Sequence, residues 1–381
     1  MKLITFLGKG DYKETTYCWN DRAKSTRFIQ EALVEWLQPQ TTCVLLTQDA
    51  QRHSNWANCR LLLEGKTDIQ EVEVGIPDGK NEQELWQIFT AIDGVVEEKD
   101  TLAFDITHGF RSLPIIALLV IAYLKQIKSV QVAHLLYGAF DSKDERGTPV
   151  FELTPFIELL DWLTAAKMFI STGDSRELAS LLEKEQNEAW RSHLPNRPRN
   201  LKSLASVLKT VSSNLLLSRV PHLAESVQKL HKTLSDKQVQ DEIREHALPL
   251  VPLMEQVKQA YHPFAQNDLR TQVELIEWYL QREHVVQAMT LAREWIISHR
   301  LAEQHKDWRD GEARRQMEDS LNAHAEQEPL WSKVRDLRND IAHCGFGRAE
   351  GQVLKADNIS QQAKEVLEHI RQLADELPTG E

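Results

Sequence analysis

The sequence has 381 residues, of which 41% are hydrophobic and 27% charged, and its formal net charge is −12 at pH 7. This length allows two domains, and the composition is that of an ordinary globular protein. Both halves are acidic: residues up to Glu158 contain 16 Lys and Arg against 23 Asp and Glu, and the remaining residues contain 29 against 34. This charge argues against a protein that coats DNA non-specifically. It leaves room for a local nucleic-acid site.

The first 155 residues alternate between strand and helix patterns. Apolar runs that end in turn residues predict strands, and helical spacing of apolar residues predicts helices between them. The expected strands are 2–8, 41–48, 69–79, 101–109, 130–140 and 149–154, and the expected helices are 28–37, 55–65, 85–92 and one from residue 113. This alternation predicts a mainly parallel sheet with helices on both faces, in a domain of residues 1–160.

The pattern changes after Pro155, where strand signals almost disappear. Helical spacing continues to the end of the chain, and proline-containing segments at 194–200 and 247–252 are the expected breaks. The fold class is therefore α/β plus all-α. The helical domain is expected over 161–381, and its first part, about 161–265, is expected to serve as linker helices.

Cysteine use and hydropathy indicate the compartment. The four cysteines have no C-x-x-C spacing, which is typical of a reducing cytoplasm; they are Cys18, Cys43, Cys59 and Cys344. The beginning of the chain lacks the pattern of a signal peptide, and the longest apolar stretch, 113–124, is too short to cross a bilayer. We expect a cytoplasmic protein without a membrane partner.

The loop after the first strand is one candidate ligand site, because open α/β sheets bind ligands beyond the carboxyl ends of their strands. Gly8 and Gly10 would let the backbone approach a phosphate, and Lys9 would supply charge. Neither G-x-G-x-x-G nor a P-loop pattern accompanies them, so a plain tight turn is the simpler interpretation of this loop taken alone.

The segment "DITHGFRSLP", residues 105–114, is the second candidate. Ser112 is a plausible helix N-cap, free backbone N–H groups there would bind an anion, and Arg111 could clamp it. A salt-bridging Arg111 and a structural His108 are the alternative, and we favour the ligand site because of its place in the sheet. Tyr137, at the end of the next strand, could add a stacking surface.

These segments resemble a known family. "DITHGFRSLP", the early "FLGKG" and the later "FELTPFIELLDWL" are similar to the CRISPR-associated Rossmann-fold (CARF) sensor domain of type III CRISPR accessory proteins. The resemblance implies a Rossmann-like domain, a homodimer and a cyclic oligoadenylate ring, of four or six adenylates, bound across the twofold axis as activator, with no cofactor. It places Lys9 and Gly10 on the first ligand loop and Thr107, His108, Gly109, Phe110, Arg111 and Ser112 on the second. With Gly8 and Tyr137 from the strand ends, these are the expected ligand-binding residues.

The C-terminal half contains Arg followed closely by His in "LRNDIAHCGFG". This spacing occurs three times, about as often as chance predicts, so context must separate the pairs. Arg293 and His299 lie in a Trp- and Ile-rich helix typical of packing, and Arg300 and His305 lie in a strongly charged run.

The pair Arg338 and His343 stands in a more favourable setting. Val334, Leu337 and Ile341 predict a buried stripe, Asn339 and His343 share a face, and Gly345 and Gly347 end the helix beside His343. An ordinary polar helix end remains the alternative.

This region is similar to the HEPN ribonuclease domains that accompany CARF sensors. The resemblance implies a metal-independent endoribonuclease that cleaves single-stranded RNA, with Arg338, Asn339 and His343 as catalytic residues. The chemistry fits, because His moves protons near neutral pH and Arg stabilises charge on a phosphorane. A single copy supplies one such His, so a twofold dimer would complete the site.

Three other functions stay open. The protein could be a dimeric nucleotide-sensing regulator without ribonuclease activity, or a ring nuclease that degrades the bound cyclic oligoadenylate. A nicotinamide-dependent Rossmann enzyme is more distant, because the third glycine of its fingerprint is missing. No metal-binding constellation stands out in the sequence.

Overall fold

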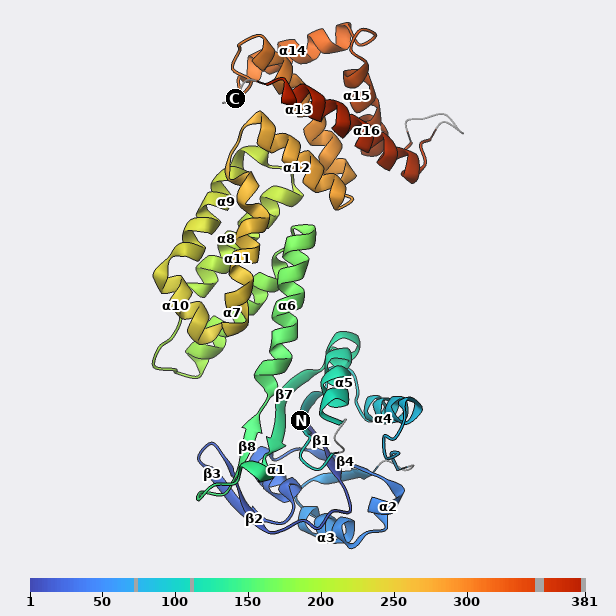
Figure 1. Ribbon diagram of the computed structural model, residues 1–381, viewed down its shortest axis with the longest axis vertical. Helices are drawn as coiled ribbons and strands as arrows, with labels where there is room; N and C mark the ends of the chain where they lie inside the picture. The colour runs from blue at the N-terminus through green and yellow to red at the C-terminus, as the bar shows by residue number, and fades with distance from the viewer. Residues whose placement is uncertain (72–74, 110–112, 347–352, 378–381) are drawn as a thin grey trace. The chain divides into compact units, whose positions relative to one another are not determined.

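The computed structural model describes residues 1–71, 75–109, 113–346 and 353–377. The chain forms two compact units, Met1–Asp161 and Trp162–Glu381 (Figure 1). The first unit contains a sheet covered by helices, and the described part of the second is helical.

An eight-stranded sheet forms the centre of the first unit as described. Its strands are β1 (Lys2–Leu7), β2 (Thr15–Trp19), β3 (Arg22–Thr26), β4 (Thr41–Leu46), β5 (Asp68–Glu71), β6 (Thr101–Asp105), β7 (Gln131–Gly138) and β8 (Thr148–Glu152). They lie in the order β3-β2-β8-β7-β6-β1-β4-β5. Five neighbouring pairs are parallel, while β2–β3 and β7–β8 are antiparallel. The prediction of a mainly parallel sheet is confirmed.

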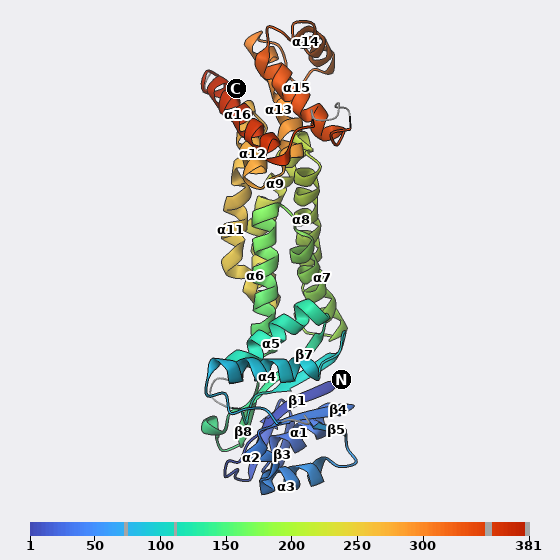
Figure 2. The ribbon, with the colours of Figure 1, turned by 90° about the vertical axis from the view of Figure 1, so that its right-hand side faces the viewer.

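Helices cover both faces of this sheet (Figures 1 and 2). They are α1 (Ile29–Leu37), α2 (Gln48–Gln51), α3 (Ser54–Leu63), α4 (Glu82–Gly94) and α5 (Leu113–Lys128). Along β1, Leu3 and Leu7 pack with α1 and α3, whereas Ile4 and Phe6 pack with α4 and α5. Successive side chains of a strand point to opposite faces, so burial of both faces explains why β1 is largely apolar and buried from Leu3 to Leu7.

The β2–β3 hairpin was not predicted. Thr15–Trp19 and Arg22–Thr26 are short and largely polar, and most of β3 is solvent-exposed. The turn signal was present in Asn20 and Asp21, where Asn20 has a positive φ of 53°. This edge hairpin matters for the site, because it brings Tyr17 beside the carboxyl end of β7.

The second unit packs around one hydrophobic core of buried residues. Its helices are α6 (Thr154–Thr172), which begins in the first unit, α7 (Arg176–Arg191), α8 (Leu201–Leu216), α9 (Val220–Ser235), α10 (Lys237–His246), α11 (Val251–Tyr261), α12 (Leu269–Gln281), α13 (Val285–Glu303), α14 (Gly311–Ala323), α15 (Pro329–Ala342) and α16 (Ala356–Asp375). The predicted break at 194–200 separates α7 from α8, and the break at 247–252 leads into α11. Among the helices described, none is both long and apolar enough to span a membrane.

Helix α15 packs against α13 and α16 and carries the second candidate site. Trp331, Val334 and Leu337 are almost completely buried on its inner face, and Ile341 is partly buried against the same core. The predicted buried stripe of this helix is therefore confirmed.

Candidate functional site

A pocket of about 310 Å³ lies at the carboxyl ends of β6 and β7. Three residues expected at a ligand site, Thr107, His108 and Tyr137, line it together. The remaining lining residues are Asp11, Tyr12, Lys13, Tyr17, Arg27, Gly138, Phe140 and Asp141. Four aromatic rings and two cations thus surround a space at the edge where parallel sheets bind ligands.

A buried carboxylate positions Thr107. Asp105 is fully buried at the end of β6, and its Oδ1 accepts hydrogen bonds from the Thr107 hydroxyl at 2.5 Å and the Thr107 N–H at 3.0 Å. Its Oδ2 accepts from the Thr5 hydroxyl at 2.6 Å. The Thr107 hydroxyl in turn accepts the Gly138 N–H at 2.8 Å and so joins β6 to β7. Burial raises the pKa of the Asp105 carboxyl, and its hydrogen bonds from Thr107 and Thr5 oppose this rise.

His108 stacks on Tyr12, with ring centroids 4.1 Å apart and planes inclined by 32°. The Tyr12 hydroxyl accepts the Gly8 N–H at 2.9 Å, which ties the ring pair to the loop after β1. Burial lowers the pKa of His108 to about 4, so the imidazole is neutral at pH 7. Its Nε2 is buried and has no hydrogen-bond partner among the described residues, which leaves a ring nitrogen for a ligand.

The glycine loop contributes differently from what its sequence suggests. Lys9 is exposed and pairs with Asp49 at 2.5 Å, and it does not line the pocket. Gly8 and Gly10 are held through their carbonyls, which accept the Asn55 Nδ2 hydrogens at 3.2 and 2.9 Å. The loop therefore shapes the pocket by fixing Tyr12.

Of the other residues expected at a ligand site in the β6–α5 turn, the structure describes Gly109 alone. A Cβ on Gly109 would lie 2.0 Å from Leu113 Cδ2, so only glycine fits there, but Gly109 does not line the pocket. Phe110, Arg111 and Ser112 lie outside the described residues.

Sequence reasoning missed most of the pocket wall. Asp11, Tyr12 and Lys13 follow Gly10 in the chain, so the predicted loop site could have included them. Tyr17 and Arg27 belong to the unpredicted hairpin and its exit, and only the tertiary fold brings them to the pocket. Lys13 and Arg27 are exposed, and neither forms an ion pair within the described part of the chain.

The second candidate site lies at the C-terminal end of α15. His343 is its C-cap residue and is exposed, and its N–H donates to Asn339 O at 2.9 Å. Arg338 Nη1 donates to Asn339 Oδ1 at 3.3 Å, so these two polar side chains are in contact. The helix end thus carries an exposed imidazole about one turn after an amide and a guanidinium that contact each other.

A left-handed turn stops the helix directly after His343. Cys344 has φ 53° and Gly345 has φ 76°. The Cys344 N–H donates to Ile341 O at 3.0 Å, and the Gly345 N–H donates to Asp340 O at 2.9 Å. These two bonds define a Schellman motif. The predicted stop is confirmed at Gly345, while Gly347 lies outside the described residues.

In the two competing Arg–His pairs, His299 and both arginines have structural roles. His299 is 3% exposed and stacks on Trp295 with centroids 4.9 Å apart, and Arg293 pairs with Glu294 and Glu318. Arg300 is likewise bound to Glu303 and Glu328. The described residues contain no group of three or more His, Cys, Asp or Glu side chains arranged to hold a metal ion.

Two comparisons with known proteins bear on the chain. Residues 2–141 match the CARF domain of the CRISPR system endoribonuclease Csx1, and residues 158–263 match the second domain of the CRISPR-associated protein MJ1674. The CRISPR-associated protein MJ1674 of Methanocaldococcus jannaschii is 24% identical over 205 residues. This alignment covers 52% of the present chain and 29% of that relative. The sheet unit is therefore a CARF domain, and the helical segment that follows it is similar to the second domain of a CRISPR-associated protein.

Proposed function

We propose that this chain is a homodimeric, metal-independent endoribonuclease that cyclic oligoadenylate activates in type III CRISPR antiviral defence. The observation that carries this proposal is the combination in one chain of a CARF domain with a formed pocket and a helix end that carries partly buried Arg338 and Asn339 and exposed His343. The first would sense the activator, and the second would cut single-stranded RNA.

The sensor pocket has the chemistry that an adenylate requires. Tyr12, Tyr17, Tyr137 and Phe140 provide aromatic surface for bases, and Lys13 and Arg27 provide charge for phosphates. The neutral His108 offers a free Nε2 as an acceptor or, in its other tautomer, a donor. Asp11 and Asp141 in the same wall would suit ribose hydroxyls as acceptors.

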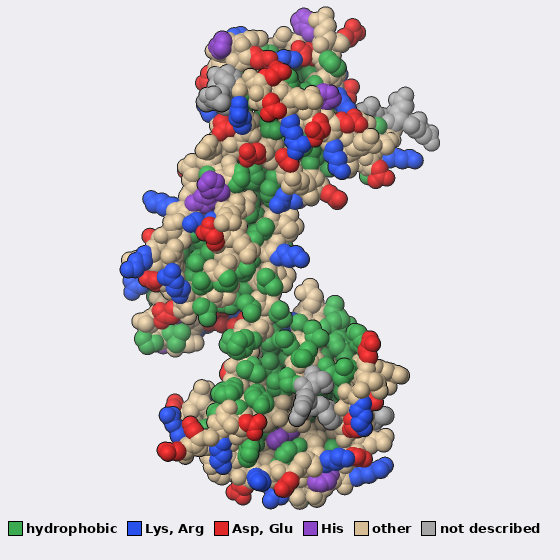
Figure 3. Space-filling model, in the orientation of Figure 1, with side chains coloured by type: hydrophobic (Ala, Val, Ile, Leu, Met, Phe, Trp, Pro, Cys, Tyr) green, Lys and Arg blue, Asp and Glu red, His purple; other side chains and the backbone are tan. Residues whose placement is uncertain are grey.

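An exposed apolar stripe on α5 supports a twofold dimer of the sensor unit. Ile115, Leu119, Tyr123 and Ile127 follow one another at intervals of four residues and are 42–67% exposed. Trp86 on α4 is 61% exposed, and Figure 3 shows hydrophobic side chains gathered over this part of the unit. Monomeric proteins rarely expose contiguous apolar patches of this kind. A second copy presenting the same stripe would cover it in an isologous interface.

The α15 end suits cleavage through the 2′-hydroxyl of RNA. His343 of one copy would remove the 2′-hydroxyl proton as the oxygen attacks phosphorus, and His343 of the second copy would protonate the departing 5′-oxygen. Arg338 would stabilise the charge on the phosphorane, and Asn339 would hold the guanidinium in place. The products would be a 2′,3′-cyclic phosphate and a free 5′-hydroxyl.

Cleavage of labelled RNA across a panel of cyclic oligoadenylates tests the proposal. We expect cutting only when a cyclic tetra- or hexa-adenylate is present. We expect Arg338→Ala and His343→Ala each to reduce the rate roughly 100-fold or more, because a proton-transfer group, or a group that stabilises charge in the transition state, contributes about that much. EDTA should leave the rate unchanged.

Matched controls come from the same helical region. Arg335 lies on α15 beside Asp336, and His369 is exposed on α16, so Arg335→Ala and His369→Ala should cut like the natural protein. If Arg338→Ala and His343→Ala also retain full activity, the proposed catalytic residues are wrong.

A non-catalytic regulator is the second candidate function. The two matched segments end at residue 263, and the Arg338 cluster lies beyond them. Tight binding of the activator without RNA cleavage in the panel would favour this function. Chromatography of the ring after incubation would reveal linear products if the CARF domain degraded its ligand.

A further inference from the structure

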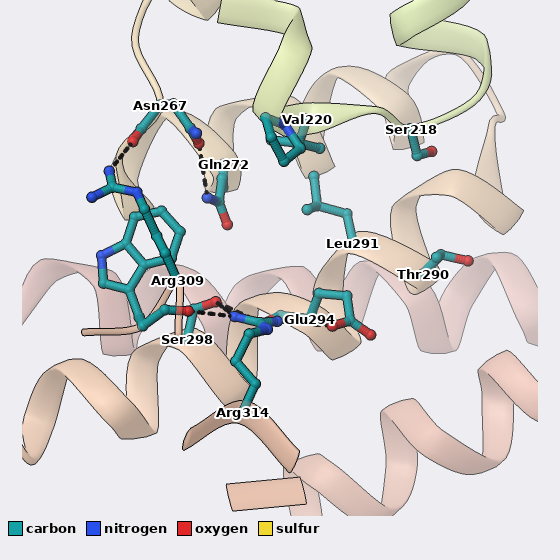
Figure 4. A pocket seen from close by; sticks show the side chains of 12 residues that line it. Ser218, Val220, Asn267, Gln272, Thr290, Leu291, Glu294, Ser298, Arg309 and Arg314 are labelled. Carbon is teal, nitrogen blue, oxygen red and sulfur yellow. Dashed lines mark hydrogen bonds and ion pairs between the residues drawn. The ribbon is translucent and has the colours of Figure 1, made fainter. Parts of the chain in front are cut away.

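A second pocket, of about 470 Å³, lies wholly within the helical unit (Figure 4). One wall is the α8–α9 turn with Val220, and the opposite wall is α13 with Leu291 and Ser298. The start of α12 and the α13–α14 connection complete it. Its volume is in the range that holds a small organic ligand.

The pocket has a built polar lining. Gln272 and Ser298 are only 5% and 2% exposed. Gln272 donates its Nε2 hydrogen to Asn267 Oδ1 at 3.3 Å, and Figure 4 shows its Oε1 directed away from that bond into the pocket. An amide oxygen held in this way on a buried side chain is a fixed acceptor for a ligand donor.

Most of the charge in the pocket is already neutralised. Arg314 Nη2 pairs with Glu294 Oε2 at 2.8 Å, and Arg314 Nη1 donates to Ser298 Oγ at 2.6 Å. The Arg309 guanidinium instead lies 4.1 Å above the Trp308 ring and donates to Asn267 O at 3.0 Å, and this guanidinium has no carboxylate partner within the described part of the chain. One free cation therefore stands beside an aromatic ring at the rim.

These features select a chemical class. A single carboxylate cannot hold a metal ion, one uncompensated cation is too little for a polyphosphate, and the buried amide and hydroxyl disfavour an aliphatic chain. A flat heterocycle fits. The Val220 and Leu291 side chains and the indole of Trp308 would contact its faces, and the Gln272 amide would form a hydrogen bond with its edge. Arg309 would then meet one phosphate.

We propose that this pocket binds the base of a nucleotide, with the attached phosphate on Arg309. The α8–α9 turn belongs to the segment that matches the MJ1674 second domain, whereas α12, α13 and α14 follow it. A bound base contacts both parts and stabilises their present arrangement. The source is either an unstacked base of single-stranded RNA or a free nucleotide, and binding does not depend on whether RNA is cut.

Calorimetric titration of the full-length protein tests this proposal with uridine 5′-monophosphate, adenosine 5′-monophosphate, a six-nucleotide RNA and inorganic phosphate as probes. We expect a mononucleotide to bind, and Gln272→Leu and Arg309→Gln to weaken it at least fivefold. Arg315→Gln is the matched control, since Arg315 is an exposed arginine of α14 that contacts Glu312 outside the pocket. Because Arg309 is exposed, the Arg309→Gln variant should fold normally. It therefore tests the proposal even if Gln272→Leu unfolds the protein.

The outcomes separate cleanly. If the RNA displaces the mononucleotide, the natural ligand is an unstacked base of RNA. If the RNA fails to displace it, the natural ligand is a free nucleotide. The proposal is overturned if neither mononucleotide binds at millimolar concentration, if phosphate alone displaces the nucleotide equally well, or if Arg309→Gln binds like Arg315→Gln. None of these results requires ribonuclease activity, so they are independent of the outcome for Arg338 and His343.

Discussion

Replacement of Thr107 by valine should lower the free energy of unfolding of the CARF domain, because Thr107 joins β6 to β7 beside the pocket. Valine has nearly the shape of threonine, so the change removes the hydroxyl with little change in packing. That hydroxyl donates to Asp105 Oδ1 at 2.5 Å and accepts the Gly138 N–H at 2.8 Å. A hydrogen bond to a charged group is worth about 2 kcal/mol, and an orphaned buried N–H costs about 1 kcal/mol, so we expect a loss of roughly 3 kcal/mol.

The loss should depend on pH in a defined direction. Burial raises the pKa of Asp105 above that of the unfolded chain, so this group stabilises the fold most at low pH and loses that stabilisation as pH rises through the folded pKa. The Thr107 hydrogen bond favours the charged carboxylate and opposes the shift. Its removal should therefore destabilise the domain more above the folded pKa of Asp105 than below it.

Hydrogen exchange measured by mass spectrometry on peptides from residues 1–161 reports on this unit alone. A loss of about 3 kcal/mol lowers amide protection in β6 and β7 roughly 100-fold, since each 1.4 kcal/mol is tenfold. Thr16→Val is the matched control, because its hydroxyl contacts only Ser25 Oγ at 2.7 Å on the exposed hairpin among the described side chains. Equal protection in Thr107→Val and Thr16→Val would refute the reasoning.

Two further predictions concern His108 and the α5 stripe. Because the pKa of His108 is about 4 in the folded protein and 6.5 ordinarily, the unfolded chain takes up its proton first, and stability should fall by up to about 1.4 kcal/mol per pH unit between pH 6.5 and 4. Urea unfolding at several pH values should show that the unfolding free energy of His108→Gln falls less steeply with decreasing pH. The same pH dependence in His108→Gln and the natural protein would contradict the lowered pKa of His108. Sedimentation velocity should show that Leu119→Glu is monomeric, while Leu61→Glu, altered at an equally exposed residue on α3, stays dimeric. Dimeric Leu119→Glu would place the interface elsewhere.

The alternation of elements in the CARF domain was readable from the sequence because its parallel strands are buried on both faces. The central strands β1 and β4 are rich in buried apolar residues, and the amphipathic helices between strands show apolar stripes. The β2–β3 hairpin was missed because β2 is only five residues long and β3 is an edge strand with exposed polar residues, which has no such pattern. The same limit hid Tyr17 and Arg27.

The roles of individual side chains depended on tertiary contacts. Lys9 was a reasonable phosphate ligand by composition, yet in the fold it pairs with Asp49, 40 residues away in sequence. The helical pocket likewise joins Val220, Gln272 and Arg309 from three separate segments, and no local pattern marks such a convergence.

The sequence by itself determined the class of the fold, the buried stripe of α15 and the turn that ends it, because hydrophobic periodicity and glycine conformation are local properties. Only the tertiary structure decided which polar groups meet. Contacts between distant segments form the pocket walls, stack Tyr12 on His108 and pair Arg314 with Glu294. Those contacts follow from the packing of the whole chain.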